Sequence, residues 1–423
     1  MIVLDDGPVA AGETERTTAH ASNALDDRYV ELERIHGEEG ARLAAESHSA
    51  AIDQIGRIAA EEKIDCDFRR LDGYLFAPIG EKQDILREEH DAARRAGLDV
   101  TLVEKAPLQD FDTGTALRFP DQATFDAGKY MAGLARAVTE ADGAIHTGTR
   151  VEAIEEGEEV TVKVRGGKAV RCAHVVVATN APVNDNVQIY AKQAPYRTYV
   201  VAMEIPRGEA PDILLWDTLD PYHYVRIHRL DDRRDLLIVG GEDHKTGHAE
   251  DMEERWRRLE AWTRVRFPAA GRTRRRWSGQ VMEPADGLAM IGRLPGGGGN
   301  AYVITGDSGN GITHGTLGGM LVADLIAGRK NPWEDLYDPS RLRLKSAPDL
   351  LRENATVAKD YGDWVTPGDE ESVRSIPKDS GAVIRDGLEK VAVYRDRDGT
   401  LHKCSAVCPH RGCVVRWNDG EKS

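Results

Sequence analysis

The segment CPHRGC, residues 408–413, brings together residue types that bind metal ions. Cysteine thiolates and histidine imidazoles are the donors found in zinc sites and iron–sulfur centres. With Cys404, this region contains three of the five cysteines of the chain, and the other two are Cys66 and Cys172. An odd number of cysteines, three of them close together, does not resemble the disulfide framework of a secreted domain. We therefore expect a cytoplasmic protein with a local metal cluster.

A glycine loop in the segment AYVITGDSGNGITHGT has the order of elements that binds an electron-rich group. Apolar residues 301–305 predict a strand, and the loop after it leads into a helix with small residues up to Gly319. Such a loop points backbone N–H groups and the positive end of the helix at a phosphate or at the pyrimidine oxygens of a reduced flavin. The alternative is a glycine-rich turn that only caps the helix.

The first residues, MIVLDDG, place a carboxylate at the end of a short apolar strand. In dinucleotide-binding folds, an acid at the end of the second strand accepts hydrogen bonds from the ribose hydroxyls. Asp5 is the candidate for this role. A solvated turn is the alternative interpretation.

Hydrophobic periodicity predicts an α/β fold around these segments. A long amphipathic helix is expected from about Tyr29 to Lys63. Further helices are expected at about 81–96, 126–140 and 250–267 and after the glycine loop. The predicted strands are the segment DGYLFAP, an apolar parallel-type strand at 175–178, antiparallel strands through 195–241, and a small β module from about 373.

Length and charge limit the possible partners. At 423 residues, the chain favours a large two-lobed unit with an appendage. The formal charge of −16 argues against nucleic acid, and we interpret the single basic cluster, 272–276, as a solvated face. No apolar stretch approaches the roughly 20 residues of a membrane-spanning helix. We also find no pattern of a secretory signal.

Six segments, in order, resemble the glycine/D-amino-acid oxidase family of FAD-dependent oxidoreductases, and specifically its branch with a C-terminal Rieske module. The resemblance covers nearly all of residues 1–330. The segments are VLDDG, TTAH, GTRVEAI, VVVATNAP, WSGQVMEPADGLAMIG and GDSGNGITHGTLGGMLVADLIAG.

The resemblance implies a Rossmann-like FAD lobe and an α+β substrate lobe. The FAD lobe would comprise about 1–65, 142–190 and 285–335, and the substrate lobe about 66–141 and 191–284. The oxidoreductase region would thus span 1–340, followed by a linker at 341–372 and a Rieske module at 373–423.

The resemblance also assigns residues to the cofactor. Asp5 would bind the adenosine ribose, Val151 the adenine, and the glycine loop would face the isoalloxazine ring. The full set is Asp5, Thr17, Thr18, Ala19, His20, Val151, Ala178, Thr179, Asn180, Gly309, Asn310, Gly311, Ile312 and Thr313.

Two family features are not found. The family begins with a strand and the motif G-x-G-x-x-G, a unit of roughly 30 residues that precedes the acid and would include the central strand of the sheet. Only four residues precede Asp5. The second Rieske loop, Cys-x-x-Cys-His, is likewise not found after CPHRGC. We therefore expect a chain truncated at both ends, with an incomplete all-β Rieske module.

The resemblance implies that Cys408 and His410 are ligands of a [2Fe–2S] cluster in the complete family member. Cys413 would match a position that forms a disulfide in many members. A zinc site made of Cys404, Cys408, His410 and Cys413, or simply free thiols, are the alternatives.

The family reaction is transfer of a hydride from a C–H next to an amine nitrogen to the flavin, so the expected substrate is an amine or an amino acid. Tyr224 and Arg226 would share one face of a strand, and we expect them to contact this substrate. Electron exchange with a Rieske centre, and so with an electron-transfer partner, favours a dehydrogenase or reductase over a simple oxidase. An inactive fragment and an NAD-dependent dehydrogenase are the competing hypotheses.

Overall fold

The computed structural model of the chain describes residues 1–78, 80–183, 187–249, 251–348, 367–370, 372–387, 389–407, 414–420 and 422. The helices are α1 (Arg28–Glu61), α2 (Asp84–Arg95), α3 (Ala127–Glu140), α4 (Val187–Tyr190), α5 (Met252–Arg266), α6 (Gly311–Ile326) and α7 (Glu334–Tyr337). A 3₁₀ turn, Leu344–Ser346, follows α7.

The strands in the first half of the chain are β1 (Ile2–Leu4), β2 (His20–Ala21), β3 (Arg69–Phe76), β4 (Thr101–Val103), β5 (Ala116–Thr124), β6 (Ala144–His146), β7 (Val151–Glu155), β8 (Val160–Val164), β9 (Ala169–Cys172) and β10 (Val175–Val177). Those in the second half are β11 (Gln193–Pro206), β12 (Leu214–Asp217), β13 (His223–Arg229), β14 (Arg234–Lys245), β15 (Thr273–Pro284), β16 (Met290–Arg293), β17 (Ala301–Thr305), β18 (Ser380–Asp386), β19 (Glu389–Arg395) and β20 (Leu401–Ser405).

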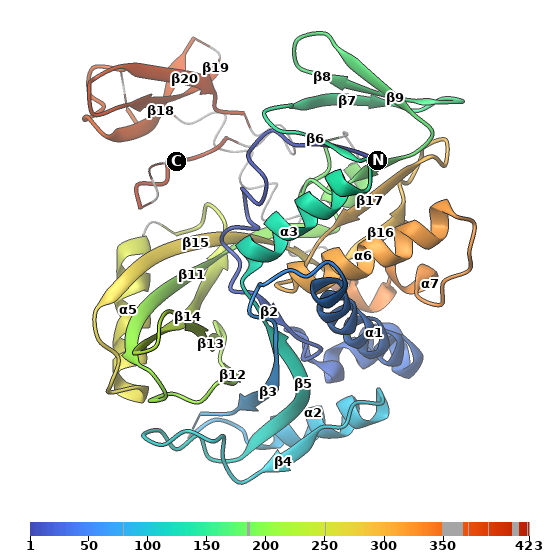
Figure 1. The fold of residues 1–423 in the computed structure, drawn as a ribbon. Helices are drawn as coiled ribbons and strands as arrows, with labels where there is room; N and C mark the ends of the chain where they lie inside the picture. Colours follow the sequence, from blue (N-terminus) through green and yellow to red (C-terminus); the bar gives the residue numbers. More distant parts are fainter. Residues whose placement is uncertain are drawn as a thin grey trace.

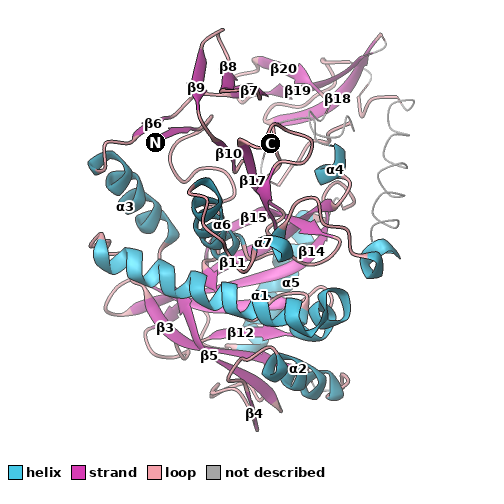
Figure 2. Cartoon of the chain, turned by 90° about the vertical axis from the view of Figure 1, so that its right-hand side faces the viewer, coloured by secondary structure: helices cyan, strands magenta, loops and turns pink. Residues whose placement is uncertain are grey.

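The largest sheet has two buried faces. Its strand order is β15-β11-β14-β13-β12-β3-β5-β2, with β4 paired to β5. On β13, Val225 and Ile227 pack with Trp256 of α5, whereas Tyr224 belongs to the core cluster that contains α1. This alternation follows from the two-residue period of a strand. Helix α5 therefore covers one face of the sheet, and α1 crosses the other (Figures 1 and 2).

The predicted helices are found close to their expected positions. The long amphipathic helix is α1, which is interrupted at Gly37, where φ is 78° and ψ is 170°. Helix α2 ends before Gly97, whose positive φ of 93° is the left-handed conformation common after helices. The prediction of antiparallel strands over 195–241 needs one correction, because β12 pairs antiparallel with β13 but parallel with β3.

The Rossmann-like lobe contains its parallel strands in two separate sheets. Strand β1 pairs in parallel with β6, and β10 pairs in parallel with β17, which also pairs with β16. No described strand pairs with the second edge of β1 or of β10. Ile2 and Val176, on these two strands, are more exposed than large apolar residues usually are, at 53% and 41%. The parallel strand pairs of this part of the chain thus lie in two separate sheets.

The segment after α6 is held against the body by a buried ion pair. Arg341 donates from Nε and Nη2 to the two carboxylate oxygens of Asp286, at 2.7 and 2.8 Å. Lys192 donates to the carbonyl oxygens of Pro339 and Arg341, at 2.8 Å each. The predicted linker therefore begins on a packed stretch, and the greater part of 341–372 lies outside the described residues.

A small antiparallel sheet, β18-β19-β20, follows. Its core contains Ile376, Ile384 and Val393. The ring of Trp417 stacks on that of Tyr394, with the ring centroids 5.2 Å apart. The β module expected from about residue 373 is thus present as a three-stranded sheet (Figure 1).

Among the described helices, none combines the length and the apolar character needed to cross a membrane.

Candidate active site

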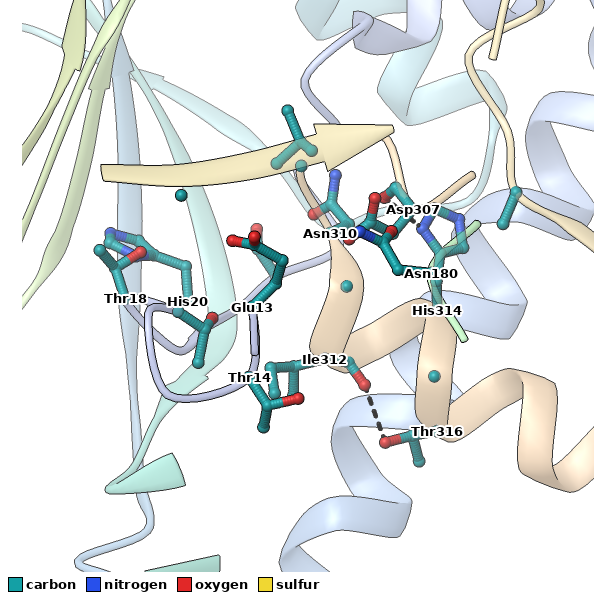
Figure 3. Close-up of a pocket in the computed structure, with 18 of the residues that line it drawn as sticks. Glu13, Thr14, Thr18, His20, Asn180, Asp307, Asn310, Ile312, His314 and Thr316 are labelled. Carbon is teal, nitrogen blue, oxygen red and sulfur yellow. Dashed lines mark hydrogen bonds between the residues drawn. The ribbon is translucent and has the colours of Figure 1, made fainter. Parts of the chain in front are cut away.

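A cavity of about 800 Å³ lies between the large sheet and helix α6. Its size is within the range of sites for cofactors and small molecules. Figure 3 shows Thr18 and His20 on one side of the cavity, and Asn180, Asp307, Asn310 and His314 around the start of α6 on the other. Segments distant in the sequence therefore meet in one space.

The glycine loop forms the wall at the start of α6. Gly306 and Gly309 have positive φ angles of 73° and 72°, which favour glycine. A Cβ on Gly309 would also collide with the carboxylate of Asp26. Asn310 donates from its backbone N–H to Asp307 and from its side chain to Ser308, so the loop is held by its own hydrogen bonds.

The helix that follows presents bare backbone to the cavity. Gly315 and Gly319 lie one turn apart on α6, line the cavity, and would meet nothing within 4 Å if a Cβ were added. The first N–H groups of a helix have no acceptor in a preceding turn, and they carry the positive end of the helix dipole. A flat, electron-rich group can therefore approach this helix closely.

His20 is fixed as a neutral ring on the opposite wall. Its Nε2 donates to the carbonyl of Val225 at 3.4 Å, and its Nδ1 accepts from the hydroxyl of Thr18 at 3.0 Å. Burial, together with the charge of Arg226, lowers the pKa of His20 to about 3. The ring stands edge-on to Tyr224, with their centroids 5.5 Å apart.

A polar network covers the sheet side of the cavity. The hydroxyl of Tyr222 donates to Asp26 at 2.9 Å, and the hydroxyls of Thr198 and Tyr224 are 2.9 Å apart. Thr198 also forms a hydrogen bond with the carboxylate of Asp243. Burial raises the pKa of Asp243 to about 7. Burial raises the pKa of Asp26 to about 7 as well, but Asp26 is exposed to the cavity, so water there weakens the shift.

Two histidines pack behind the glycine loop. His314 donates from Nδ1 to the carbonyl of Asp307 at 2.8 Å, and His48 donates from Nδ1 to the carbonyl of Ala44 at 3.0 Å. Their rings meet edge to face with centroids 4.5 Å apart, and neither Nε2 has a hydrogen-bond partner. Burial lowers the pKa of both rings, that of His48 to about 4. Both are therefore neutral at physiological pH.

Nine of the fourteen residues predicted to bind the cofactor line this one cavity: Thr17, Thr18, His20, Ala178, Asn180, Gly309, Asn310, Gly311 and Ile312. Ala19 and Thr313 are buried and do not line it. Asp5 and Val151, predicted for the adenosine half, and Thr179, another of the fourteen, do not line it either. Asp5 lies at the end of β1, where its carboxylate accepts from the N–H of Gly7.

The two predicted substrate contacts have different positions. Tyr224 lines the cavity. Arg226 is buried outside the cavity lining and donates to the carbonyl of Phe125 at 3.2 Å. Burial lowers the pKa of Arg226 to about 10.

Sequence reasoning missed Glu13, Asp26, Asp243 and Trp216, all of which line the cavity. Asp26 precedes a long helix and looked like part of an ordinary helix start. Asp243 and Trp216 lie on β14 and β12, so only the strand order of the folded sheet brings them to the site.

Comparison with known proteins identifies the family. Residues 1–325 match the family described as DAO, FAD dependent oxidoreductase. The chain belongs to this family. It is 26% identical, over its whole length, to YhfW of Bacillus subtilis (strain 168), which is named a Rieske 2Fe-2S iron-sulfur protein and of which it covers 82%. It is also 24% identical over 348 residues to the gamma-glutamylputrescine oxidoreductase of Escherichia coli (strain K12), covering 78% of each chain.

Two solved structures have the same fold as this FAD-dependent oxidoreductase. Glycine oxidase from Geobacillus kaustophilus superimposes with a TM-score of 0.66 at 18% identity, over 81% of this chain and 92% of that one. L-proline dehydrogenase from P. horikoshii superimposes with a TM-score of 0.64 at 19% identity, over 80% and 96%. The predicted family and the mixed α/β fold are thus confirmed.

The residues of this oxidoreductase fit the flavin half of FAD. The cavity offers a glycine loop, a helix start and the uncovered face at Gly315 and Gly319, where added side chains would fill the space. These are the features with which a protein backbone approaches a flat, electron-rich ring.

The predicted metal ligands Cys408 and His410, and also Cys413, lie outside the described residues. Within the part of the chain that the structure describes, no three His, Cys, Asp or Glu side chains come together to hold a metal ion. Cys404, on β20, is an exposed free thiol.

Proposed function

We propose that this chain binds FAD and catalyses the oxidation of a C–H bond next to the nitrogen of an amine or amino acid. The observation that carries the proposal is the single cavity in which the glycine loop of α6 faces Tyr222, Tyr224 and Trp216 of the large sheet. When bound, FAD supplies the acceptor for the hydride. The family membership of residues 1–325 and the relative named gamma-glutamylputrescine oxidoreductase support this choice.

The residues of the chain would act by binding and orientation. The positive end of α6 would stabilise negative charge that develops on the ring system near Gly311. Tyr224, held by Thr198, and the neutral His20 would orient the substrate from the opposite wall. The buried ring of Trp216 would limit the entry of water.

We propose further that the complete protein exchanges electrons between the flavin and a Rieske [2Fe–2S] centre, with Cys408 and His410 among its ligands. The name of YhfW and the three-stranded sheet β18-β19-β20 support this assignment. Such an exchange makes a dehydrogenase or reductase, which passes its electrons to a partner protein.

We also propose that the reaction takes place in the cytoplasm. Cys66, Cys172 and Cys404 are free thiols, and Cys66 is buried. Free thiols are usual in the reducing cytoplasm, where disulfides are rare.

The test is anaerobic reduction of the FAD-loaded protein. A panel of amines and amino acids is added, and the visible flavin absorption band is followed. At least one compound is expected to bleach the band, and Tyr224→Phe, which keeps the ring but loses the hydroxyl, is expected to bleach more slowly. If the protein holds FAD and dithionite bleaches it, but no amine or amino acid does, the proposed reaction is wrong.

A further inference from the structure

The lining of the cavity is rich in carboxylates. Five described residues that line the cavity carry carboxylates: Glu13, Asp26, Asp243, Glu283 and Asp307. Of the lysines and arginines, only Arg16 is among these described lining residues, and its guanidinium donates to the carbonyl of Ser278 at 3.1 Å. The lining histidines, His20 and His314, are neutral. The field in the cavity therefore favours cations.

A carboxylate oxygen in this cluster still lacks a hydrogen-bond donor. Oδ1 of Asp243 is buried and has no hydrogen-bond partner, although the side chain lines the cavity. An unpartnered buried carboxylate oxygen is costly, and a nearby cation lowers that cost through its charge. Because Oδ1 has almost no accessible surface, an ammonium group in the cavity would act on the Asp243 carboxylate through its charge.

Aromatic rings surround the carboxylates. Tyr222 and Tyr224 lie with centroids 5.6 Å apart, and Trp216 lines the same wall. The electron-rich faces of such rings attract cations, and Trp does so most strongly. The hydroxyl of Tyr222 fixes Asp26 at 2.9 Å, so rings and carboxylates form one connected surface.

A clamp for a substrate carboxylate is not found on this surface. Arg226, the arginine nearest to this role by sequence, is buried outside the cavity lining and donates to the carbonyl of Phe125. A carboxylate entering the cavity would face Asp26 and Asp243, whereas Arg255, whose charge acts on Asp243, is not among the described residues that line the cavity. Like charges in an enclosed site repel, so an α-amino acid is a poor match.

We propose that the cavity selects a diamine or polyamine, whose second ammonium group binds between Asp26 and Asp243 against the rings of Tyr222, Tyr224 and Trp216. The proposal rests on the proposed function for the identity of the reaction, but the carboxylates and rings belong to the chain itself. Selective binding can therefore be measured with or without FAD.

Proton release provides an independent signature. The pKa of Asp243 is raised to about 7, chiefly because the carboxylate is buried. The hydrogen bond from Thr198 and the charge of Arg255 act to lower this pKa, whereas Asp220 and Glu242 act to raise it. A bound ammonium favours the ionised form. Binding of a diamine below pH 7 therefore releases a proton. The affinity is expected to rise between about pH 6 and pH 8, where aliphatic amines stay protonated.

The experiment is calorimetric titration with 1,4-diaminobutane, butylamine and glycine. We expect 1,4-diaminobutane to bind about tenfold or more tightly than the matched monocation butylamine, and glycine to bind more weakly than both. Asp26→Asn and Asp243→Asn should each remove most of the difference between diamine and monoamine. Asp243→Asn should also reduce the rise with pH, to which Asp26 contributes as well. Asp110→Asn, at an exposed position outside the cavity, should change nothing.

Two outcomes would overturn the proposal: glycine that binds as tightly as 1,4-diaminobutane, or Asn variants that keep the full preference for the diamine. If an Asn variant does not fold, two other measurements test the proposal. One is the comparison of the three ligands on the unchanged chain, and the other is Tyr222→Phe, which removes the hydrogen-bond donor to Asp26. A chain that prefers the diamine but never takes up FAD would refute the proposed function and leave this inference standing. A chain that takes up FAD but does not prefer the diamine would refute this inference and leave the proposed function standing.

Discussion

At the scale of single residues, the site is defined by glycines that leave its wall without side chains and by carboxylates that line it. Gly309 allows the loop to turn beside Asp26, and Gly315 leaves the wall of α6 bare. Asp243 holds its carboxylate in the cavity with one oxygen unpartnered. Each of these features makes a separate prediction.

Alanine at Gly309 and at Gly315 should have opposite effects on stability. Gly309 has a φ of 72°, so Gly309→Ala should lower the free energy of unfolding by about 1 kcal/mol or more. Gly315 lies inside α6, so Gly315→Ala should raise it by about 0.5–1 kcal/mol. Both changes narrow the cavity and should weaken FAD binding. Urea unfolding measures the effect on stability, and titration with FAD measures the effect on affinity. If Gly315→Ala binds FAD as tightly as the unchanged chain, the flavin does not lie against α6 at this position.

The buried carboxyl of Asp243 should make stability depend on pH. Its pKa is raised to about 7 in the folded chain, so the folded state holds the proton more tightly than the unfolded state. The contribution of Asp243 to the free energy of unfolding is therefore fully present below the unfolded pKa of about 3.9 and is lost as the pH rises through about 7. Between these values, the free energy of unfolding falls by up to about 1.36 kcal/mol per pH unit. Urea unfolding of the ligand-free protein from pH 5 to pH 8 should show the decline. If the stability of Asp243→Asn falls just as steeply with pH, other groups cause the decline.

The sequence indicated the residues that share a local segment. TTAH and GDSGNGIT were predicted as cofactor loops, and nine of the fourteen predicted cofactor residues line the cavity. Asp26, Asp243 and Trp216 were missed because they come from a helix start and two strands that meet only through the order of the sheet. Arg226 follows the same alternation as Tyr224, but the alternation does not reveal how far a side chain lies from the cavity.

At the scale of elements, hydrophobic periodicity predicted where the helices lie, but it did not predict which strands pair with one another. The amphipathic pattern located α1 within two residues at each end, because apolar spacing is a local property. The parallel pairing of β12 with β3 joins residues 73–76 to 214–217, and no local pattern encodes a partner so far away. The ion pair of Arg341 with Asp286, which anchors the segment after α6, could likewise not be predicted from the sequence.

Removal of the anchoring arginine should be costly. Arg341→Ala leaves the buried carboxylate of Asp286 without its partner, and we expect a loss of about 3–5 kcal/mol in the free energy of unfolding. Although burial raises the pKa of Asp286, the charge of Arg341 outweighs this effect and keeps the pKa below its ordinary value. The control is the double variant Asp286→Asn with Arg341→Met, which should recover much of the loss in a urea unfolding experiment. An Arg341→Ala chain of unchanged stability would show that the pair does not anchor the segment.

At the scale of the whole molecule, the large sheet and helix α6 enclose one cavity. Strand β17, which leads into the glycine loop, belongs to a sheet separate from that of β1. The predicted adenosine contacts, Asp5 and Val151, lie outside this cavity. The flavin ring should therefore contribute more to FAD binding by this chain than the adenosine half does.

The most direct measurement is an equilibrium titration of the purified chain with FAD, followed by quenching of flavin fluorescence. We expect saturable binding of one FAD per chain and binding of FMN that is weaker by no more than about tenfold. Both should be lost in Gly315→Leu, whose side chain would occupy the flavin position. No saturable binding of FAD, or equal binding by Gly315→Leu, would contradict the placement of the flavin against α6.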